Sequence, residues 1–159
     1  MISLELARAL RTAGLRWRPR SGDGFVIETV TDADTGDGRG GTPAEVFTVS
    51  EMTVEVQDHP TGSLIGFNGT TEWALDSVAI ADALWLPRED QLRVLLRDGF
   101  ETLQVDRDGP DEPLYLVTAV IRGRRRTYEA SSAADAYGEA VLDLIVQSLV
   151  SDEENRLEQ

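Results

Sequence analysis

The sequence predicts an α+β protein in which one or more antiparallel sheets carry helices on one face. Two kinds of pattern support this fold class. Towards both ends of the chain, apolar residues recur every three or four positions, as they do along the buried face of a helix. Between these segments, short stretches alternate apolar and polar residues and are bounded by turn-forming residues, as strands are.

The first half is expected to open with a helix over about residues 3–13, which Gly14 is placed to end. Four strand patterns follow, at residues 25–27, 46–49, 52–56 and 64–67. Residues 31–44 hold four glycines and three aspartates and have few side chains to bury, so we expect a flexible surface loop there. Residues 72–84 are expected to form a helix, although their apolar positions wrap almost completely around it.

The second half is expected to open with a helix between Pro87 and Gly99, because proline favours a first turn and glycine favours the position after a last turn. Three strand patterns follow, at residues 100–105, 114–121 and 125–130. A last helix is expected after Ser132, which with Asp135 resembles a capping box. Its apolar side forms one stripe, made up of Tyr137, Ala140, Val141, Leu144, Ile145, Ser148 and Leu149. Residues 151–159 are expected to be a disordered acidic tail.

Two domain organisations fit this pattern. In the first, residues 1–84 and 85–150 are separate halves, each with the order helix, three strands, helix, so that the chain contains a duplicated α-β-β-β-α unit. In the second, residues 1–150 form one domain with a single sheet and helices packed on one of its faces. The sequence leaves both organisations open.

Charge and composition exclude several classes of protein. The chain has 15 arginines, no lysine and 29 acids, and its net charge of −14 discourages broad contact with nucleic acid or anionic lipid. It has no cysteine, which excludes disulfides, a cysteine nucleophile and thiolate metal sites. No apolar run reaches the roughly 20 residues that span a bilayer, and the first residues lack the apolar core of a signal peptide. We therefore expect a cytoplasmic protein without a membrane segment.

The common catalytic and cofactor-binding signatures are missing. The sequence has no phosphate-binding loop, dinucleotide fingerprint, serine-hydrolase elbow or zinc-protease motif. Asp32 and Asp34 resemble the start of a calcium loop, but the fifth and twelfth positions of that loop are glycine and proline. His59 is the only histidine and lies beside Asp58 in an expected turn. We predict no catalytic residue, no metal and no cofactor, and leave open whether His59 has a role.

Candidate binding residues come from polar segments that contain tryptophan and from two arginine clusters, around Trp17 and at residues 122–126. Arginine pairs with phosphate or carboxylate, and tryptophan often anchors interfaces. The alternative is that the arginines pair with the protein's own acids and that the tryptophans are buried in the core. The candidates are Arg16, Trp17, Arg18, Asn68, Glu72, Trp73, Trp85 and Arg124.

The α-β-β-β-α order expected for residues 87–150 resembles the double-stranded-RNA-binding domain. In that family, lysines at the start of the last helix bind phosphate. The corresponding segment here, residues 131–136, contains an aspartate and no basic residue. We therefore do not expect RNA binding.

Five segments spread over residues 6–92 carry a second resemblance, at residues 6–11, 13–17, 52–56, 67–78 and 84–92. In these segments the chain is similar to a family of small uncharacterised actinobacterial proteins, some of which carry a pilus-assembly name. The phosphate-binding loop that a pilus-assembly ATPase needs is absent. The resemblance implies an actinobacterial, cytoplasmic origin, which the exclusive use of arginine also fits, and it implies no activity.

Two principal functional hypotheses follow. We favour a noncatalytic binding or regulatory module whose partner is another protein, with Trp73 and Trp85 as anchors. The alternative is an enzyme or small-ligand-binding protein with a pocket between the two halves, lined by Trp17, Arg124, Asn68, Glu72 and His59. A third hypothesis is an acidic mimic of nucleic acid, which needs rows of acids on one face. The oligomeric state is not predicted.

Overall fold

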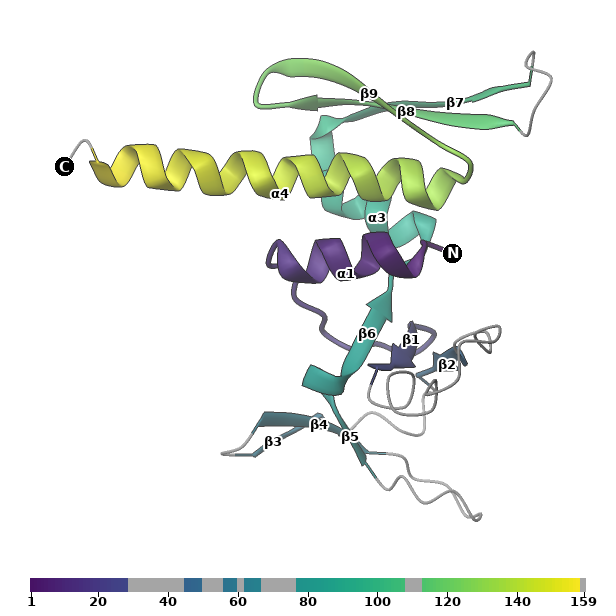
Figure 1. The fold of residues 1–159 in the computed structure, drawn as a ribbon, viewed down its shortest axis with the longest axis vertical. Helices are drawn as coiled ribbons and strands as arrows, with labels where there is room; N and C mark the ends of the chain where they lie inside the picture. Colours follow the sequence, from purple (N-terminus) through teal and green to yellow (C-terminus); the bar gives the residue numbers. More distant parts are fainter. Residues whose placement is uncertain (29–44, 50–55, 60–61, 67–76, 108–112, 158–159) are drawn as a thin grey trace, which may run out of the picture. The chain divides into compact units, whose positions relative to one another are not determined.

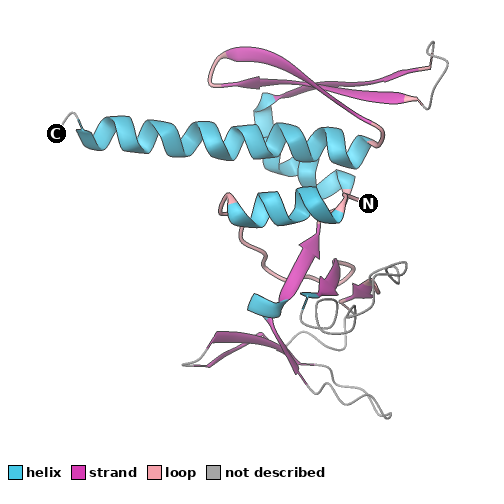
Figure 2. Cartoon of the chain, in the orientation of Figure 1, coloured by secondary structure: helices cyan, strands magenta, loops and turns pink. Residues whose placement is uncertain are grey.

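The computed structural model describes residues 1–28, 45–49, 56–59, 62–66, 77–107 and 113–157 (Figures 1 and 2). They form helices and antiparallel sheets, which confirms the predicted α+β fold class. The chain divides into two compact units. One unit comprises Met1–Arg16 together with Pro87–Gln159, and the other comprises Trp17–Leu86.

The first unit contains the helix–three strands–helix order that was predicted for the second half of the chain. Its elements are α1 (Leu4–Thr12), α3 (Glu89–Leu96), the 3-10 turn η2 (Arg97–Gly99), β7 (Phe100–Asp106), β8 (Leu114–Ile121), β9 (Arg124–Ala130) and α4 (Ala133–Leu157). The strands form an antiparallel sheet in the order β7-β8-β9. This part of the prediction is confirmed.

Strand β8 lies at the centre of this sheet, and its sequence shows why. Val117, Ala119 and Ile121 alternate with half-buried residues, and all three are buried. Helix α4 contacts β8 and β9 (Figure 1), so one face of the sheet is covered. The connection from β8 to β9 is a tight turn in which both Arg122 and Gly123 have positive φ, as a two-residue hairpin turn of type I′ requires.

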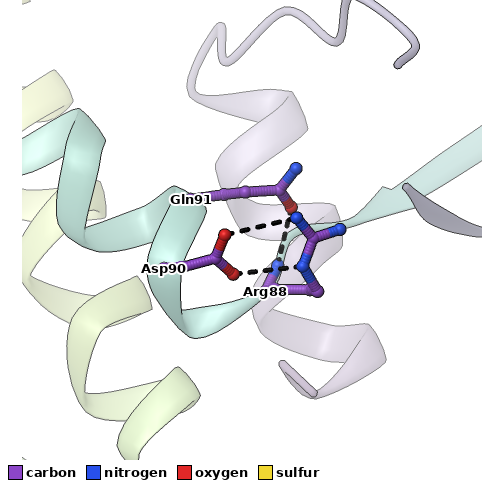
Figure 3. Close-up of polar contacts among 3 residues, drawn as sticks. All are labelled: Arg88, Asp90 and Gln91. Atoms are coloured by element: carbon purple, nitrogen blue, oxygen red, sulfur yellow. Dashed lines mark hydrogen bonds and ion pairs between the residues drawn. The ribbon is translucent and has the colours of Figure 1, made fainter. Parts of the chain in front are cut away.

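Helix α3 begins with a side-chain cap from Gln91 and an ion pair between Arg88 and Asp90 (Figure 3). The backbone N–H of Arg88 donates to Oε1 of Gln91 at 2.9 Å, which satisfies a backbone donor just before the helix. The Arg88 guanidinium donates to both carboxylate oxygens of Asp90, at 3.1 and 3.2 Å. That hydrogen bond is the main reason why the pKa of Asp90 lies below its usual value.

The start of α4 is fixed by the predicted cap and by contact with the N-terminus of α1. The backbone N–H of Asp135 donates to Oγ of Ser132 at 3.1 Å, and the Asp135 carboxylate accepts from the backbone N–H of Ser3 at 2.7 Å. Residues 151–157, which we expected to be a disordered tail, continue this helix to Leu157. Within the described part of the chain, no helix is long and apolar enough to cross a membrane.

Helix α1 packs against α4 at Gly138. A Cβ atom at that position would lie 2.6 Å from Cδ2 of Leu6 and 2.9 Å from Cδ1 of Ile2, so the absence of a side chain lets the two helices approach closely. Leu6, Ala7 and Leu10 on α1 are buried as a result. The division therefore differs from the expected one at residue 84, because the first 16 residues belong with the C-terminal part of the chain.

The second unit contains two three-stranded antiparallel sheets. The first has the order β2-β1-β6, with β1 (Gly24–Ile27), β2 (Phe47–Thr48) and β6 (Ala83–Leu86). The second has the order β3-β4-β5, with β3 (Val56–His59), β4 (Gly62–Gly66) and β5 (Ser77–Ala79). The 3-10 turn η1 (Ile80–Asp82) joins β5 to β6. Phe25, Ile27, Val49 and Ala83 form the core of this unit.

Two expectations for the first half differ from the structure. Residues 77–84, expected to be helical, form β5, η1 and the start of β6. The described part of Trp17–Leu86 has six strands in two sheets, so it does not repeat the α-β-β-β-α order of the C-terminal half. The expected loop at 31–44 and residues 72–76 lie outside the described residues.

Candidate functional site

Helix α4 has a buried first half and an exposed apolar second half. The buried residues are Ala134, Ala136, Tyr137, Ala140 and Val141. Further along, Val146, Leu149 and Val150 are 43%, 52% and 46% exposed. Their spacing of three and four places them on one side of the helix. We call these three residues the α4 stripe.

The α4 stripe is exposed because α4 is much longer than either of the two helices that pack against it, α1 and α3. Helix α1 has 9 residues and α4 has 25, which correspond to lengths of about 14 and 38 Å. The two helices meet at Gly138, near the start of α4. Figure 1 shows the C-terminal part of α4, in yellow, continuing past the end of α1.

A polar network holds α4 against the sheet just before the stripe. Oδ2 of Asp143 accepts hydrogen bonds from Nη1 of Arg126 at 2.7 Å and from the hydroxyl of Tyr128 at 2.5 Å. Oδ1 of Asp143 accepts from Nε2 of Gln147 at 3.3 Å, and the Gln147 carbonyl accepts from Nη1 of Arg122 at 2.8 Å. These bonds connect α4 to β9 and to the β8–β9 turn, so the stripe projects from an anchored helix.

The electrostatics of this network suit a structural role. Burial, and then the hydrogen bond to Asp143, raise the pKa of Tyr128 well above its usual value. Tyr128 therefore stays neutral and acts as a donor. The Asp143 carboxylate accepts from three side-chain donors, two on β9 and one on α4, and so holds the helix against the sheet. Among the described residues, no three histidine, aspartate or glutamate side chains are grouped as a metal site needs.

The structure brings two of the predicted site residues together, Trp17 and Trp85. Their rings are nearly parallel, with an interplanar angle of 7° and centroids 6.5 Å apart. Nε1 of Trp17 donates to Oδ2 of buried Asp23 at 2.9 Å. Nε1 of Trp85 is buried and has no hydrogen-bond partner in the described part of the chain. Both rings are half-buried, and Trp17 also packs on Phe25 and on the core of its unit. Packing within this unit therefore already uses much of the surface of the two rings.

The predicted arginines lie on the surface. Arg16 and Arg18 are exposed on either side of Trp17 in the sequence, and Arg124 is exposed at the start of β9. The neighbours of Arg124 are engaged within the protein, since Arg125 pairs with Glu101 at 2.7 Å and Arg126 pairs with Asp143. For Arg125 and Arg126, the alternative that they pair with the protein's own acids is therefore confirmed.

Three further predicted residues, Asn68, Glu72 and Trp73, lie outside the described residues. His59 is the last residue of β3, and its backbone pairs with Gly62 of β4. The pocket between the two halves of the chain stays a prediction.

Comparisons of the chain with protein-family models, with curated proteins and with solved structures found no match.

Sequence reasoning missed Val146 and Val150 as surface residues. It placed Leu149 in one apolar stripe with Val141, whereas the structure buries Val141 and leaves Leu149 about half exposed. Helical spacing shows which residues share a face but not where the neighbouring helix ends. The length of the apolar pattern could have indicated this exposure. The pattern continues along α4 for more residues than a helix of nine residues such as α1 can cover.

Proposed function

We propose that the protein is a noncatalytic binding module whose partner is another protein and whose docking surface is the α4 stripe. The observation that carries this proposal is the exposure of three large aliphatic side chains on one side of an anchored helix. Single exposed apolar residues are common on protein surfaces, but contiguous apolar patches usually mark interaction sites.

The size of the stripe fits an anchor for a protein partner. Full burial of a valine or leucine side chain stabilises by about 1.5–3 kcal/mol, and these three are already partly buried. Covering all three would contribute roughly 2–4 kcal/mol, which is a large part of a moderate affinity and needs polar contacts around it. This combination of an apolar centre and a polar surround is the usual anatomy of a protein interface.

Val94 on α3 supplies a matched control. It is 73% exposed, more than any residue of the α4 stripe, but it stands alone on its helix surface. An acidic substitution there changes charge and hydrophobicity as a substitution at Leu149 does, without touching the stripe.

The test is purification of tagged protein from an extract of the organism that encodes it, with wild type, Leu149→Asp and Val94→Asp compared. We expect a protein that co-purifies in near-equal amounts with wild type and Val94→Asp and is reduced by about tenfold or more with Leu149→Asp. Circular dichroism checks that both variants keep the wild-type helix content. A partner that all three retain equally would overturn the assignment of the surface, and the absence of any partner would overturn the function.

A further inference from the structure

We propose that β7 is a second interaction surface, at which two copies of the chain pair through the backbones of their β7 strands. The sheets β7-β8-β9 of the two copies then join into one continuous sheet across a two-fold axis. This surface is separate from the α4 stripe, and the inference does not depend on the proposed function.

Strand β7 lies at one edge of its sheet. Within the described part of the chain it pairs with β8 alone, so one side of its backbone faces no other strand. The bulge near Phe100 shifts the register only at the start of the strand, and residues 102–106 pair regularly with β8. A regular edge of this kind is a template for one more strand, which forms backbone hydrogen bonds along it.

The two edges of this sheet differ in how they are protected. Proteins commonly keep edge strands from pairing by means of charged side chains, proline or a covering element. At the opposite edge, β9 (RRRTYEA) has four charged residues among its seven. In β7, residues 102–105 (TLQV) contain no charge, no proline and no glycine. The side chains therefore oppose pairing at β9 and allow it at β7.

Leu103 and Val105 of β7 lie on the face of the sheet that α4 covers. Leu103 is opposite Val117 of β8, and Val117 is opposite Tyr128, whose hydroxyl bonds to α4. Helix α4 packs on β8 and β9, and Val105, at the margin of the covered area, is 39% exposed. A strand added beside β7 with apolar residues on this face would bury more of both side chains.

The sequence of β7 is complementary to itself when two copies run antiparallel. With Gln104 on the two-fold axis, Gln104 of one copy faces Gln104 of the other. Leu103 of each copy then faces Val105 of the other, which makes two apolar pairs on the α4 side. Thr102 faces Asp106, the one charge in this ladder, so no like charges meet within it. A second copy therefore supplies both the backbone and the side chains that this edge requires.

The absence of cysteine from the sequence allows a direct test of this register. Gln104→Cys places two thiols opposite each other across the axis, with Cα atoms about 4.5–5.5 Å apart, a separation that a disulfide bridges. Glu129→Cys places a thiol at an exposed position of β9 as the matched control. The rate of formation of the disulfide-linked dimer is measured by non-reducing electrophoresis during mild oxidation. We expect Gln104→Cys to form it at least about tenfold faster than Glu129→Cys.

A second measurement, the mass in solution by light scattering, needs no oxidation. Gln104→Lys and Gln104→Glu each put like charges in facing positions, so each variant alone should be monomeric at a concentration where the wild type is dimeric. An equal mixture of the two should restore the dimer, because the facing charges are then opposite. Thr127→Lys, on β9, should leave the dimer unchanged. Added salt should strengthen the wild-type dimer, because salt screens the charge of −14 on each copy.

Other outcomes overturn the inference in distinguishable ways. A wild type with the mass of one chain at every concentration, together with equal oxidation rates of the two cysteine variants, would show that β7 does not pair with a second copy. A dimer that survives both Gln104 charge variants and is lost in Leu149→Asp would move the contact to the α4 stripe. A protein that co-purifies with wild type and is lost with Gln104→Lys, while the purified chain stays monomeric, would make the occupant of β7 an extended segment of another protein.

Discussion

Tyr128 and Asp143 connect β9 to α4 through a hydrogen bond of 2.5 Å from the phenolic hydroxyl to the carboxylate. The same carboxylate oxygen accepts from Arg126 on β9. Two donors from one strand therefore hold α4 one turn before Gln147 and directly before the exposed α4 stripe. The direction in which the stripe projects depends on this contact.

The first prediction concerns the strength of this contact. Tyr128→Phe removes the hydroxyl and leaves Asp143 with one donor from β9, so the free energy of unfolding should fall by about 1–2 kcal/mol. Urea denaturation followed by circular dichroism measures it. Tyr115→Phe is the matched control, because Tyr115 makes no side-chain hydrogen bond in the described part of the chain. Equal stability of the two variants would show that the Tyr128 hydrogen bond contributes nothing.

The second prediction concerns alkaline pH. Burial first, and then the bond to Asp143, raise the pKa of Tyr128, and burial raises that of Tyr137. A pKa raised by folding means that the folded protein holds the proton more tightly. The resulting stability is fully present below the unfolded pKa of about 10 and is lost as pH rises through the folded pKa.

We therefore expect the free energy of unfolding to fall above about pH 10 and to fall less steeply in Tyr128→Phe. Urea denaturation at a series of pH values gives the two slopes. A wild type whose stability is constant over this range, or a variant with the same slope as wild type, would contradict the raised pKa of Tyr128.

The third prediction concerns the contact between α1 and α4. Gly138→Val adds side-chain atoms where a Cβ alone would already lie 2.6 Å from Leu6. We expect a loss of about 1–3 kcal/mol in the free energy of unfolding, measured by urea denaturation, because the helices must separate to accommodate it. Glu139→Val, at the next and exposed position, should change stability by less than about 0.5 kcal/mol. If Gly138→Val is equally neutral, α1 does not pack at this point.

The fourth prediction concerns Asp23, which is only 1% exposed. Its Oδ2 atom accepts from Nε1 of Trp17 and from the backbone N–H of Arg20, both at 2.9 Å. Asp23→Ala leaves both donors without this acceptor, so we expect a loss of about 2 kcal/mol or more, measured by tryptophan fluorescence during denaturation. Asp82→Ala, at an exposed position of the same unit, should be nearly neutral. Equal stability of the two would mean that water replaces the carboxylate without cost.

The elements that the sequence predicted best are those whose burial follows one simple period. The strand predicted at residues 114–121 forms β8, in which Val117, Ala119 and Ile121 are buried and which α4 contacts. The cap at Ser132 likewise predicted the start of α4, because it depends only on residues within one turn. These signals are local, and tertiary contacts agree with them.

The prediction failed where burial has no simple period. Ala83, Leu84 and Leu86 in β6 are all buried. When this segment is read as a helix, its apolar residues are distributed around the whole helix and do not form one face. A short continuous apolar run fits a strand buried on both faces as well as it fits a helix. In this strand, pairing with β1, which no local pattern reveals, decides the outcome. The α4 stripe was missed for a related reason, since its exposure depends on where α1 ends.

Amide hydrogen exchange tests the central claim most directly, with the protein measured alone and bound to the partner that co-purifies with wild type. We expect amides after Ile145 to exchange quickly in the free protein, because Val146, Leu149 and Val150 are exposed in the part of the chain that the structure describes. We expect the partner to slow them selectively. Slowing confined to the segments around Trp17 and Trp85, with the end of α4 unchanged, would contradict the account and move the binding surface to the tryptophan pair.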